Sequence, residues 1–316
     1  MTVFDTFRLS CCRLLEQHPL CRLRRTDGPE QALHILLVGN GARMETLIQM
    51  LLTNGQLLDT VLRVTILHAG TATAENLLTG APALREFVQI TRDGQVLSDP
   101  AEPLALLRLC RCSMTPEALR EKLPAIGDAS CVIVSTGTDE KNLALARFCT
   151  ELLPEGRRLT ACVQRRLNHG FEVLAPEPAQ IIVGKQNDAY LARLEQIAYN
   201  LHYIYAKTAN DRVSSAQLRL DFEKNYNYLS NLESALHIQS KLRCCGIDAG
   251  DPAASAAAFA AYMEQDPSIV SRLAVVEHRR WVMEKLLPGY RPQADMGQIY
   301  SRSGVGTKNT EEKWHT

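Results

Sequence analysis

Short apolar runs alternate with amphipathic stretches from residue 33 to residue 183, and this alternation is the feature that most constrains the fold. Apolar runs predict buried strands at 33–38, 61–67, 86–90, 131–134, 159–163 and 180–183. Helical spacing predicts helices between several of these strands, such as 44–52 and 139–153. Strands that alternate with helices form parallel sheets through crossover connections. Residues 31–187 are therefore predicted to form an α/β domain with a doubly wound parallel sheet.

The pattern changes after residue 187, where the remaining segments have helical rather than strand periodicity. Residues 188–225 are predicted to form connecting helices, and residues 226–316 a smaller all-α domain. Apolar positions also recur at helical spacing within residues 1–30, before Gly and Pro break the pattern. We therefore expect an N-terminal helical segment, an α/β domain, connecting helices and a helical domain, in that order.

Composition and charge exclude several classes of function. The 316 residues include 35 basic and 35 acidic side chains, so the formal net charge is +0. A chain without a basic surplus is not expected to bind nucleic acid through its phosphates or to carry a polybasic membrane patch. The sequence has no run of about 18 apolar residues that could cross a membrane, and Asp5 and Arg8 interrupt the N-terminal segment where a signal peptide needs an apolar core. We therefore expect a cytoplasmic protein without membrane insertion. Its ten cysteines lack the spacing of zinc ligands.

A glycine turn follows the first predicted strand. Gly39, Asn40 and Gly41 lie between a strand and a helix, where a Rossmann-like dinucleotide fold has its phosphate-binding turn. Met44 replaces the third glycine of the G-x-G-x-x-G pattern, and His68 ends the second strand in place of the acid that holds an NAD ribose. We predict cofactor contacts from this turn, from Arg43 and Met44 beside it, and from His68. The alternative is that the glycines only make a turn.

A second loop, formed by small residues, follows the strand predicted at 131–134. A helix is predicted directly after this loop, with acidic residues in its first turn. Together with the glycine turn, this segment resembles the TrkA-N family, the nucleotide-binding regulatory domains of potassium transport. The resemblance covers residues 33–165. It implies that the adenine-ribose half of a bound nucleotide, such as NAD(H), lies beside Ser135, Thr136, Gly137, Asp139 and Asn142.

The C-terminal helical region contains the segment EHRRWVMEKLLPGY, residues 277–290. It resembles the ryanodine-receptor repeat (RyR domain), whose helix carries E-H-x-R-W followed by a G-W or G-Y turn. The family pattern continues beyond the point where this sequence ends, so we expect a truncated repeat. Aromatic rings there could stack on a flat ligand while an arginine meets a phosphate or carboxylate. The predicted ligand-binding residues are Glu277, His278, Arg280, Trp281, Tyr290 and Arg291.

A structural alternative exists for the same helix. A lone tryptophan on a helix usually packs in a core, and Glu277 and Arg280 are spaced to form an internal salt bridge. Under this interpretation the segment joins helices together and contacts no ligand.

These observations predict a cytoplasmic ligand-sensing or regulatory protein rather than an enzyme. The sequence lacks the G-x-S-x-G nucleophile elbow, the P-loop and the H-E-x-x-H zinc motif. The predicted ligand is NAD(H), another adenine nucleotide or a signal derived from one. Two alternatives remain open: an NAD(P)-dependent oxidoreductase, and a non-catalytic subunit of a homodimer or larger assembly.

Overall fold

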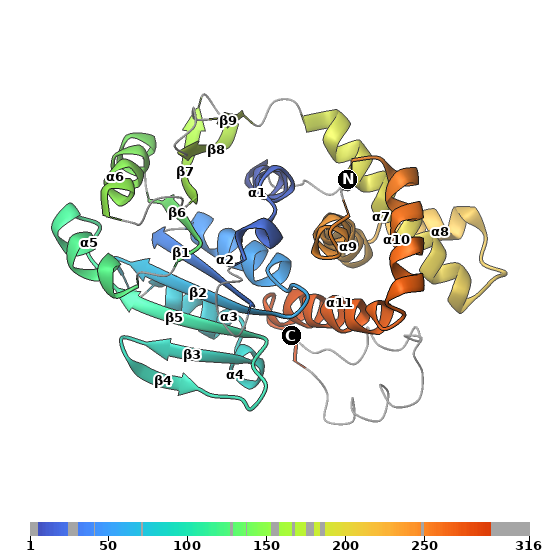
Figure 1. Ribbon diagram of the computed structural model, residues 1–316, viewed down its shortest axis with the longest axis horizontal. Helices are drawn as coiled ribbons and strands as arrows, with labels where there is room; N and C mark the ends of the chain where they lie inside the picture. The colour runs from blue at the N-terminus through green and yellow to red at the C-terminus, as the bar shows by residue number, and fades with distance from the viewer. Residues whose placement is uncertain are drawn as a thin grey trace.

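The computed structural model describes residues 6–24, 31–40, 42–70, 72–126, 129–136, 138–152, 158–165, 168–174, 180–183, 187–247 and 250–291. Within these residues one mixed sheet has the strand order β4-β3-β5-β2-β1-β6-β7-β8-β9 (Figure 1). Its strands are β1 (Gln31–Gly39), β2 (Thr60–His68), β3 (Val88–Arg92), β4 (Gln95–Ser98), β5 (Ala105–Arg111), β6 (Cys131–Ser135), β7 (Arg158–Arg165), β8 (Asn168–Leu174) and β9 (Gln180–Val183).

Six strands of this sheet run parallel, so the predicted α/β fold is confirmed. β1 pairs in parallel with β2 on one side and with β6 on the other, and the parallel arrangement continues to β5 and β3 and to β7. The direction in which successive strands are added therefore reverses at β1. Such a reversal leaves a crevice outside the carboxyl ends of the central strands, where doubly wound sheets bind ligands.

The edges of the sheet depart from the predicted parallel arrangement. β4 pairs antiparallel with β3 across a turn in which Asp93 has φ 47° and Gly94 φ 87°, as a tight hairpin requires. β8 pairs antiparallel with β7, and β9 with β8. The strand predicted at 180–183 is thus present but antiparallel, and the sequence did not predict β4, β5 or β8.

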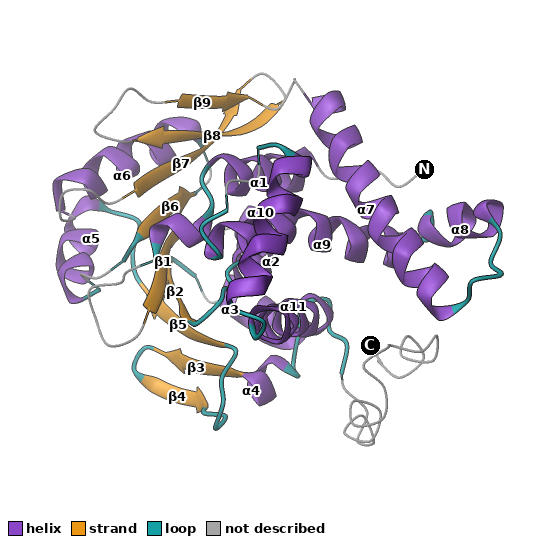
Figure 2. Ribbon diagram, turned by 45° about the vertical axis from the view of Figure 1, so that its right-hand side comes forward, coloured by secondary structure: helices purple, strands orange, loops and turns teal. Residues whose placement is uncertain are grey.

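Helices cover both faces of the central sheet and continue beyond it (Figure 2). They are α1 (Thr6–Gln17), α2 (Ala42–Asn54), α3 (Ala72–Gly80), α4 (Leu84–Phe87), α5 (Pro116–Lys122), α6 (Asp139–Leu152), α7 (Asn187–Ala209), α8 (Ser215–Phe222), α9 (Asn225–Cys244), α10 (Pro252–Gln265) and α11 (Ile269–Leu286), with short 3₁₀ turns at Leu20–Leu23 and Leu123–Ala125. Side chains of α1, α2 and α11 share one hydrophobic cluster with the sheet, and side chains of α5 and α6 share the cluster on the other face.

Local sequence signals account for several helix ends. The Thr115 hydroxyl accepts a hydrogen bond from the amide of Ala118 and caps α5, with Pro116 in the first turn. α8 ends at Phe222 and α9 begins at Asn225. Lys224 between them has extended backbone, with φ −63° and ψ 132°.

The helical part shares its core with the sheet. One cluster of buried side chains includes Leu33 of β1 and Leu47 of α2 together with Leu232 of α9 and Met283 of α11. α11 packs against α2, and α9 packs against α1, α2 and the 3₁₀ turn after α1. The boundary predicted between residues 187 and 188 falls at the start of α7, and hydrophobic packing continues across it.

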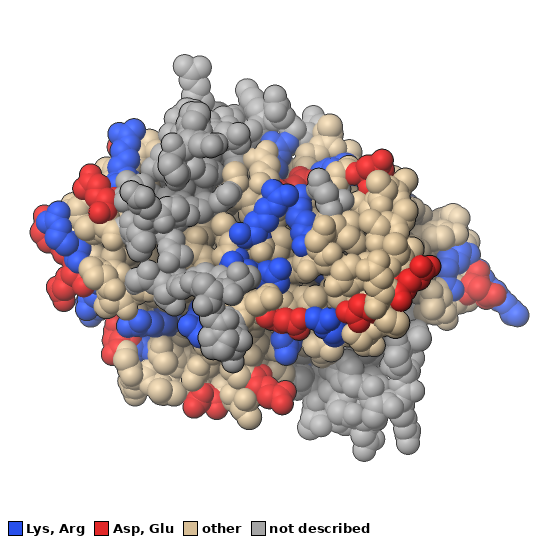
Figure 3. Space-filling view, viewed as in Figure 1, with Lys and Arg blue, Asp and Glu red and all other residues tan. Residues whose placement is uncertain are grey.

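Charged side chains are mixed on the face drawn in Figure 3. Acidic and basic side chains alternate along the strip that α11 occupies in Figure 1, and basic side chains gather near the region where α1, α2 and α9 meet. Every cysteine side chain that the structure describes is a free thiol, and most are buried. None of the described helices is both long and apolar enough to cross a membrane.

The shared core predicts a coupled effect of truncating Met283. Met283 is fully buried, and such a Met→Ala change costs about 2–5 kcal/mol of unfolding free energy. Because the same cluster includes β1, Met283→Ala should speed amide hydrogen exchange in β1 as well as in α11. The matched control is Val275→Ala on the same helix, since the Val275 side chain is 51% exposed. Faster exchange confined to α11 and α9 would contradict a shared core.

Candidate functional site

Gly39 brings two central strands into unusually close backbone contact. It ends β1 with φ 152°, and a Cβ atom placed on it would lie 1.7 Å from the carbonyl oxygen of Ser135. The Asn40 amide donates a hydrogen bond of 3.0 Å to that same oxygen. No side chain fits at this position, so glycine is required for the ends of β1 and β6 to meet. Gly41, the second glycine of the predicted turn, lies outside the described residues.

The loop after β6 is held by an internal amide. The side-chain oxygen Oδ1 of Asn142 accepts hydrogen bonds from the Thr136 amide (2.5 Å) and the Thr136 hydroxyl (2.6 Å). Asn142 is buried, and Asp139 lies in the first turn of α6. Asn142 therefore fixes the loop conformation, and Gly137 lies outside the described residues.

Two buried polar atoms flank Gly39 on the neighbouring strands. His68 ends β2, and Ser135 ends β6 in register with Gly39. The His68 side chain is buried, and its Nδ1 donates a hydrogen bond to the carbonyl oxygen of Gly70. Within the described part of the chain, His68 Nε2 and Ser135 Oγ have no hydrogen-bond partner. Buried polar atoms are rarely left unsatisfied, so this pair marks the carboxyl ends of β1, β2 and β6 as a candidate binding site.

The tautomer of His68 determines what its free nitrogen can bind. A carbonyl oxygen can only accept a hydrogen bond, so the proton of a neutral His68 ring lies on Nδ1. The Nε2 atom then carries a lone pair and can accept a hydrogen bond from a hydroxyl group. Ser135 Oγ can both donate and accept.

Arg43 and Met44 lie beside the turn but face protein. Met44 is fully buried in the hydrophobic cluster of α1, α2 and the sheet. The Arg43 guanidinium lies 5.6 Å from the centre of the Phe7 ring on α1. The predicted cofactor contact at Met44 is thus corrected: its side chain packs in the core, and only its backbone remains for a ligand.

In the C-terminal segment, the arginine that was predicted to bind a ligand makes its hydrogen bonds within the protein. Arg280 is 1% exposed. It donates hydrogen bonds to Glu277 (3.0 Å), Glu284 (2.7 Å) and the Ser234 hydroxyl (2.9 Å). The prediction that Arg280 meets an anion of a ligand is corrected, because its donors join α11 to α9. The internal salt bridge that we gave as the alternative is present.

Further charges extend this buried ion network between α9 and α11. Burial raises the pKa of Glu277, but His237, Arg280 and Lys241 together hold it well below its usual range. The ammonium of Lys241 lies 2.7 Å from Glu277 Oε2, and the fully buried His237 ring lies 3.8 Å from the same oxygen. Glu277 is therefore a structural carboxylate. The roles of Ser234, Lys241 and Glu284 were not predicted from the sequence, although the i,i+4 spacing of Arg280 and Glu284 is a recognisable signal.

The aromatic residues of the segment pack around a lysine. The ammonium of Lys285 lies 3.7 Å from the ring centre of Tyr226 and 5.9 Å from that of Trp281. Tyr290 contacts Tyr226 edge-on at 6.4 Å, and the His278 ring stacks near Trp281 at 6.2 Å. The structure thus places Lys285 beside the aromatic rings that were predicted to stack on a ligand. Arg291 is exposed and is the last of the described residues.

Comparisons with known proteins do not identify a relative. The chain matches no protein-family model, and searches among curated proteins and solved structures also returned no match. The TrkA-N and RyR resemblances therefore stay predictions, and the site is interpreted from its geometry.

The ion network predicts a large difference between two neighbouring arginines. Arg280→Met leaves Glu277 and Glu284 without their buried partner, which costs about 3–5 kcal/mol in comparable buried pairs. Arg279→Met removes the same charge at an exposed position and should change stability by less than about 0.5 kcal/mol. Urea unfolding of both variants measures the difference. Equal, small losses would show that the network does not stabilise the fold.

Burial of His237 predicts that stability falls as pH decreases toward 5.5. Burial lowers the pKa of His237, with Glu277 opposing and Lys241 and Arg280 assisting the shift. The unfolded chain binds a proton near pH 6.5, whereas the folded chain resists it. The unfolding free energy should therefore drop between pH 7.5 and pH 5.5, by up to about 1.4 kcal/mol per pH unit. His237→Gln should flatten this slope, and an unchanged slope would contradict the assignment.

Proposed function

We propose that this protein is a non-catalytic ligand sensor that binds an adenine nucleotide, or a signal derived from one, at the carboxyl ends of β1, β2 and β6. The observation that carries the proposal is the unsatisfied pair His68 Nε2 and Ser135 Oγ beside Gly39. A ligand that offers hydroxyl and phosphate groups would satisfy both atoms at the crevice of a doubly wound sheet.

His68 supports a ribose at this place. Rossmann-type dinucleotide sites place an acid at the end of the second strand, where it accepts hydrogen bonds from ribose hydroxyls. His68 occupies the end of β2, and its Nε2 can accept one such hydrogen bond. A neutral acceptor would thus take the place of the carboxylate toward a ribose hydroxyl.

The phosphates would lie at the start of α2. A helix N-terminus offers unpaired backbone amides and the positive end of the helix dipole. α2 begins at Ala42, immediately after the turn that Gly39 brings against β6. NAD(H) and ADP-ribose both combine a ribose with a pyrophosphate, and both fit this arrangement of an acceptor and a helix N-terminus.

Sensing would use the contact between α2 and α11. A ligand at the N-terminus of α2 can shift the packing of α11 only if it binds two arrangements with different affinity. α11 packs against α2 and is joined to α9 by the ion pair of Lys241 with Glu277, so a change at α2 would reach the helical part. This role is that of a cytoplasmic regulatory protein, the function that the TrkA-N resemblance implies.

Calorimetric titration with ADP-ribose, NADH and ATP tests the proposal. We expect saturable binding of at least one of them, and His68→Leu should weaken it about tenfold because one hydrogen bond is lost. His68→Gln keeps an acceptor and should weaken binding less. The control is Gln265→Leu, an exposed polar residue at the end of α10, which should leave the affinity unchanged.

Two outcomes would contradict the proposal. One is the absence of binding by all three nucleotides in a chain shown to be folded. The other is an equal effect of His68→Leu and Gln265→Leu on the affinity.

A further inference from the structure

A separate cavity lies between α7, α8 and α9, at the end of the molecule farthest from the sheet in Figures 1 and 2. Its volume is about 470 Å³. The side chains that line it come from all three helices: Ala192, Glu195, Gln196, Tyr199, Arg219, Phe222, Glu223 and Tyr228. None of these residues belongs to the crevice at Gly39, so the cavity is independent of the proposed nucleotide site.

Three aromatic rings form one wall of this cavity. Phe222 stands between the two tyrosines, with its ring centre 5.4 Å from that of Tyr199 and 5.6 Å from that of Tyr228. Both contacts are edge-to-face, at 84° and 65°. Phe222 is 4% exposed, so its ring is fixed in the core. Its edge-to-face contacts hold the rings of Tyr199 and Tyr228 in place.

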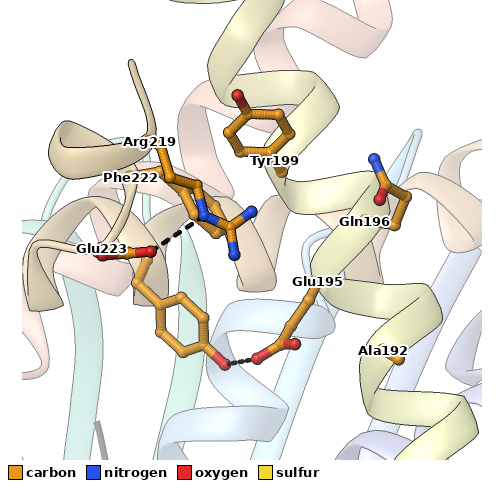
Figure 4. Close-up of a pocket in the computed structure, with 8 residues that line it drawn as sticks. Ala192, Glu195, Gln196, Tyr199, Arg219, Phe222 and Glu223 are labelled. Atoms are coloured by element: carbon orange, nitrogen blue, oxygen red, sulfur yellow. Dashed lines mark hydrogen bonds and ion pairs between the residues drawn. The ribbon is translucent and has the colours of Figure 1, made fainter. Parts of the chain in front are cut away.

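A guanidinium of the chain itself lies against this wall. The Arg219 side chain reaches from α8 toward the α7 residues Tyr199 and Glu195 (Figure 4). Its Cζ lies 5.4 Å from the centre of the Tyr199 ring, and its Nε donates a hydrogen bond of 3.0 Å to Glu223. The cavity therefore already holds one planar cation, with the Tyr199 ring on one side and the Glu223 carboxylate as the acceptor beside it.

The Arg219 side chain is held in the cavity only by weak interactions. The side chains of Arg219 and Glu223 are 61% and 56% exposed, and an exposed pair of this kind contributes little to stability. A second carboxylate, Glu195, accepts a hydrogen bond from the Tyr228 hydroxyl and also lines the cavity. Two carboxylates and one guanidinium leave one formal negative charge, which favours a cationic ligand.

We infer that this cavity binds a guanidinium group of a ligand, in the position that Arg219 occupies when the ligand is absent. A guanidinium stacks on a tyrosine face and donates hydrogen bonds to carboxylates at the same time. A quaternary ammonium lacks N–H donors and can use only the rings, and an anion would be repelled by Glu195 and Glu223. The guanidinium can come from a free small molecule or from an arginine side chain of a partner protein.

Four probes test the chemistry on the full chain. N-acetyl-arginine amide represents a protein arginine, agmatine represents a free guanidine, and N-acetyl-citrulline amide has nearly the same shape as the first without the charge. Tetramethylammonium tests the rings alone. We expect both guanidines to bind more tightly than citrulline amide and tetramethylammonium, and the tighter of the two guanidines identifies the source.

Removing the internal occupant gives the sharpest variant. Arg219→Gln should tighten binding of the guanidines about fivefold, because the ligand no longer displaces a cation from Tyr199 and Glu223. The matched control is Arg212→Gln, which removes the same charge at an exposed position between α7 and α8. Glu223→Gln in the Arg219→Gln background should weaken binding again, since it removes the acceptor.

Specific outcomes overturn the inference. One is that Arg219→Gln binds neither guanidine at about 10 mM, a concentration that detects even weak sites. Another is equal binding of arginine amide and citrulline amide. A third is an equal gain from Arg212→Gln and Arg219→Gln, which would reflect net charge alone. Circular dichroism of each variant confirms that the chain is folded.

Discussion

The close approach of Gly39 to Ser135 is the constraint on which the candidate site depends. The carbonyl oxygen of Ser135 lies where a side chain at position 39 would begin, so the ends of β1 and β6 meet only because position 39 is glycine. The same contact brings His68 and Ser135 to either side of one backbone position at the switch point. A pair of buried atoms without partners then follows from strand register rather than from a flexible loop.

The helical part is attached to this sheet by two different kinds of interaction. Hydrophobic side chains of α9 and α11 complete the cluster that covers one face of the sheet. On α11, Arg280 is buried with Glu277 and Glu284, an arrangement that tolerates few alternative packings because each unpaired charge would be costly. Lys241 bonds to Glu277 and Ser234 to Arg280, and these contacts fix how α11 lies on α9. The proposed sensing through α2 and α11 requires such a rigid attachment.

The sequence predicted the central strands and long helices well, because continuous apolar runs and helical spacing are strong signals. It missed β5, since Arg108 and Arg111 interrupt its apolar positions, and it missed the antiparallel strands β4 and β8, which depend on tertiary pairing. Within the site, it located the turn and the His68 position. It gave the salt bridge of Arg280 with Glu277 as an alternative, but it did not reveal the contact of Arg280 with Ser234, because the two residues are 46 positions apart.

A crystal structure of the protein with ADP-ribose tests the central claim most directly. The account predicts a ribose hydroxyl within about 2.7–3.2 Å of His68 Nε2, with the pyrophosphate at the first turn of α2. The Ser135 hydroxyl should gain a partner in the same complex. ADP-ribose bound elsewhere, or a His68 Nε2 that stays without a partner when the nucleotide is present, would contradict it.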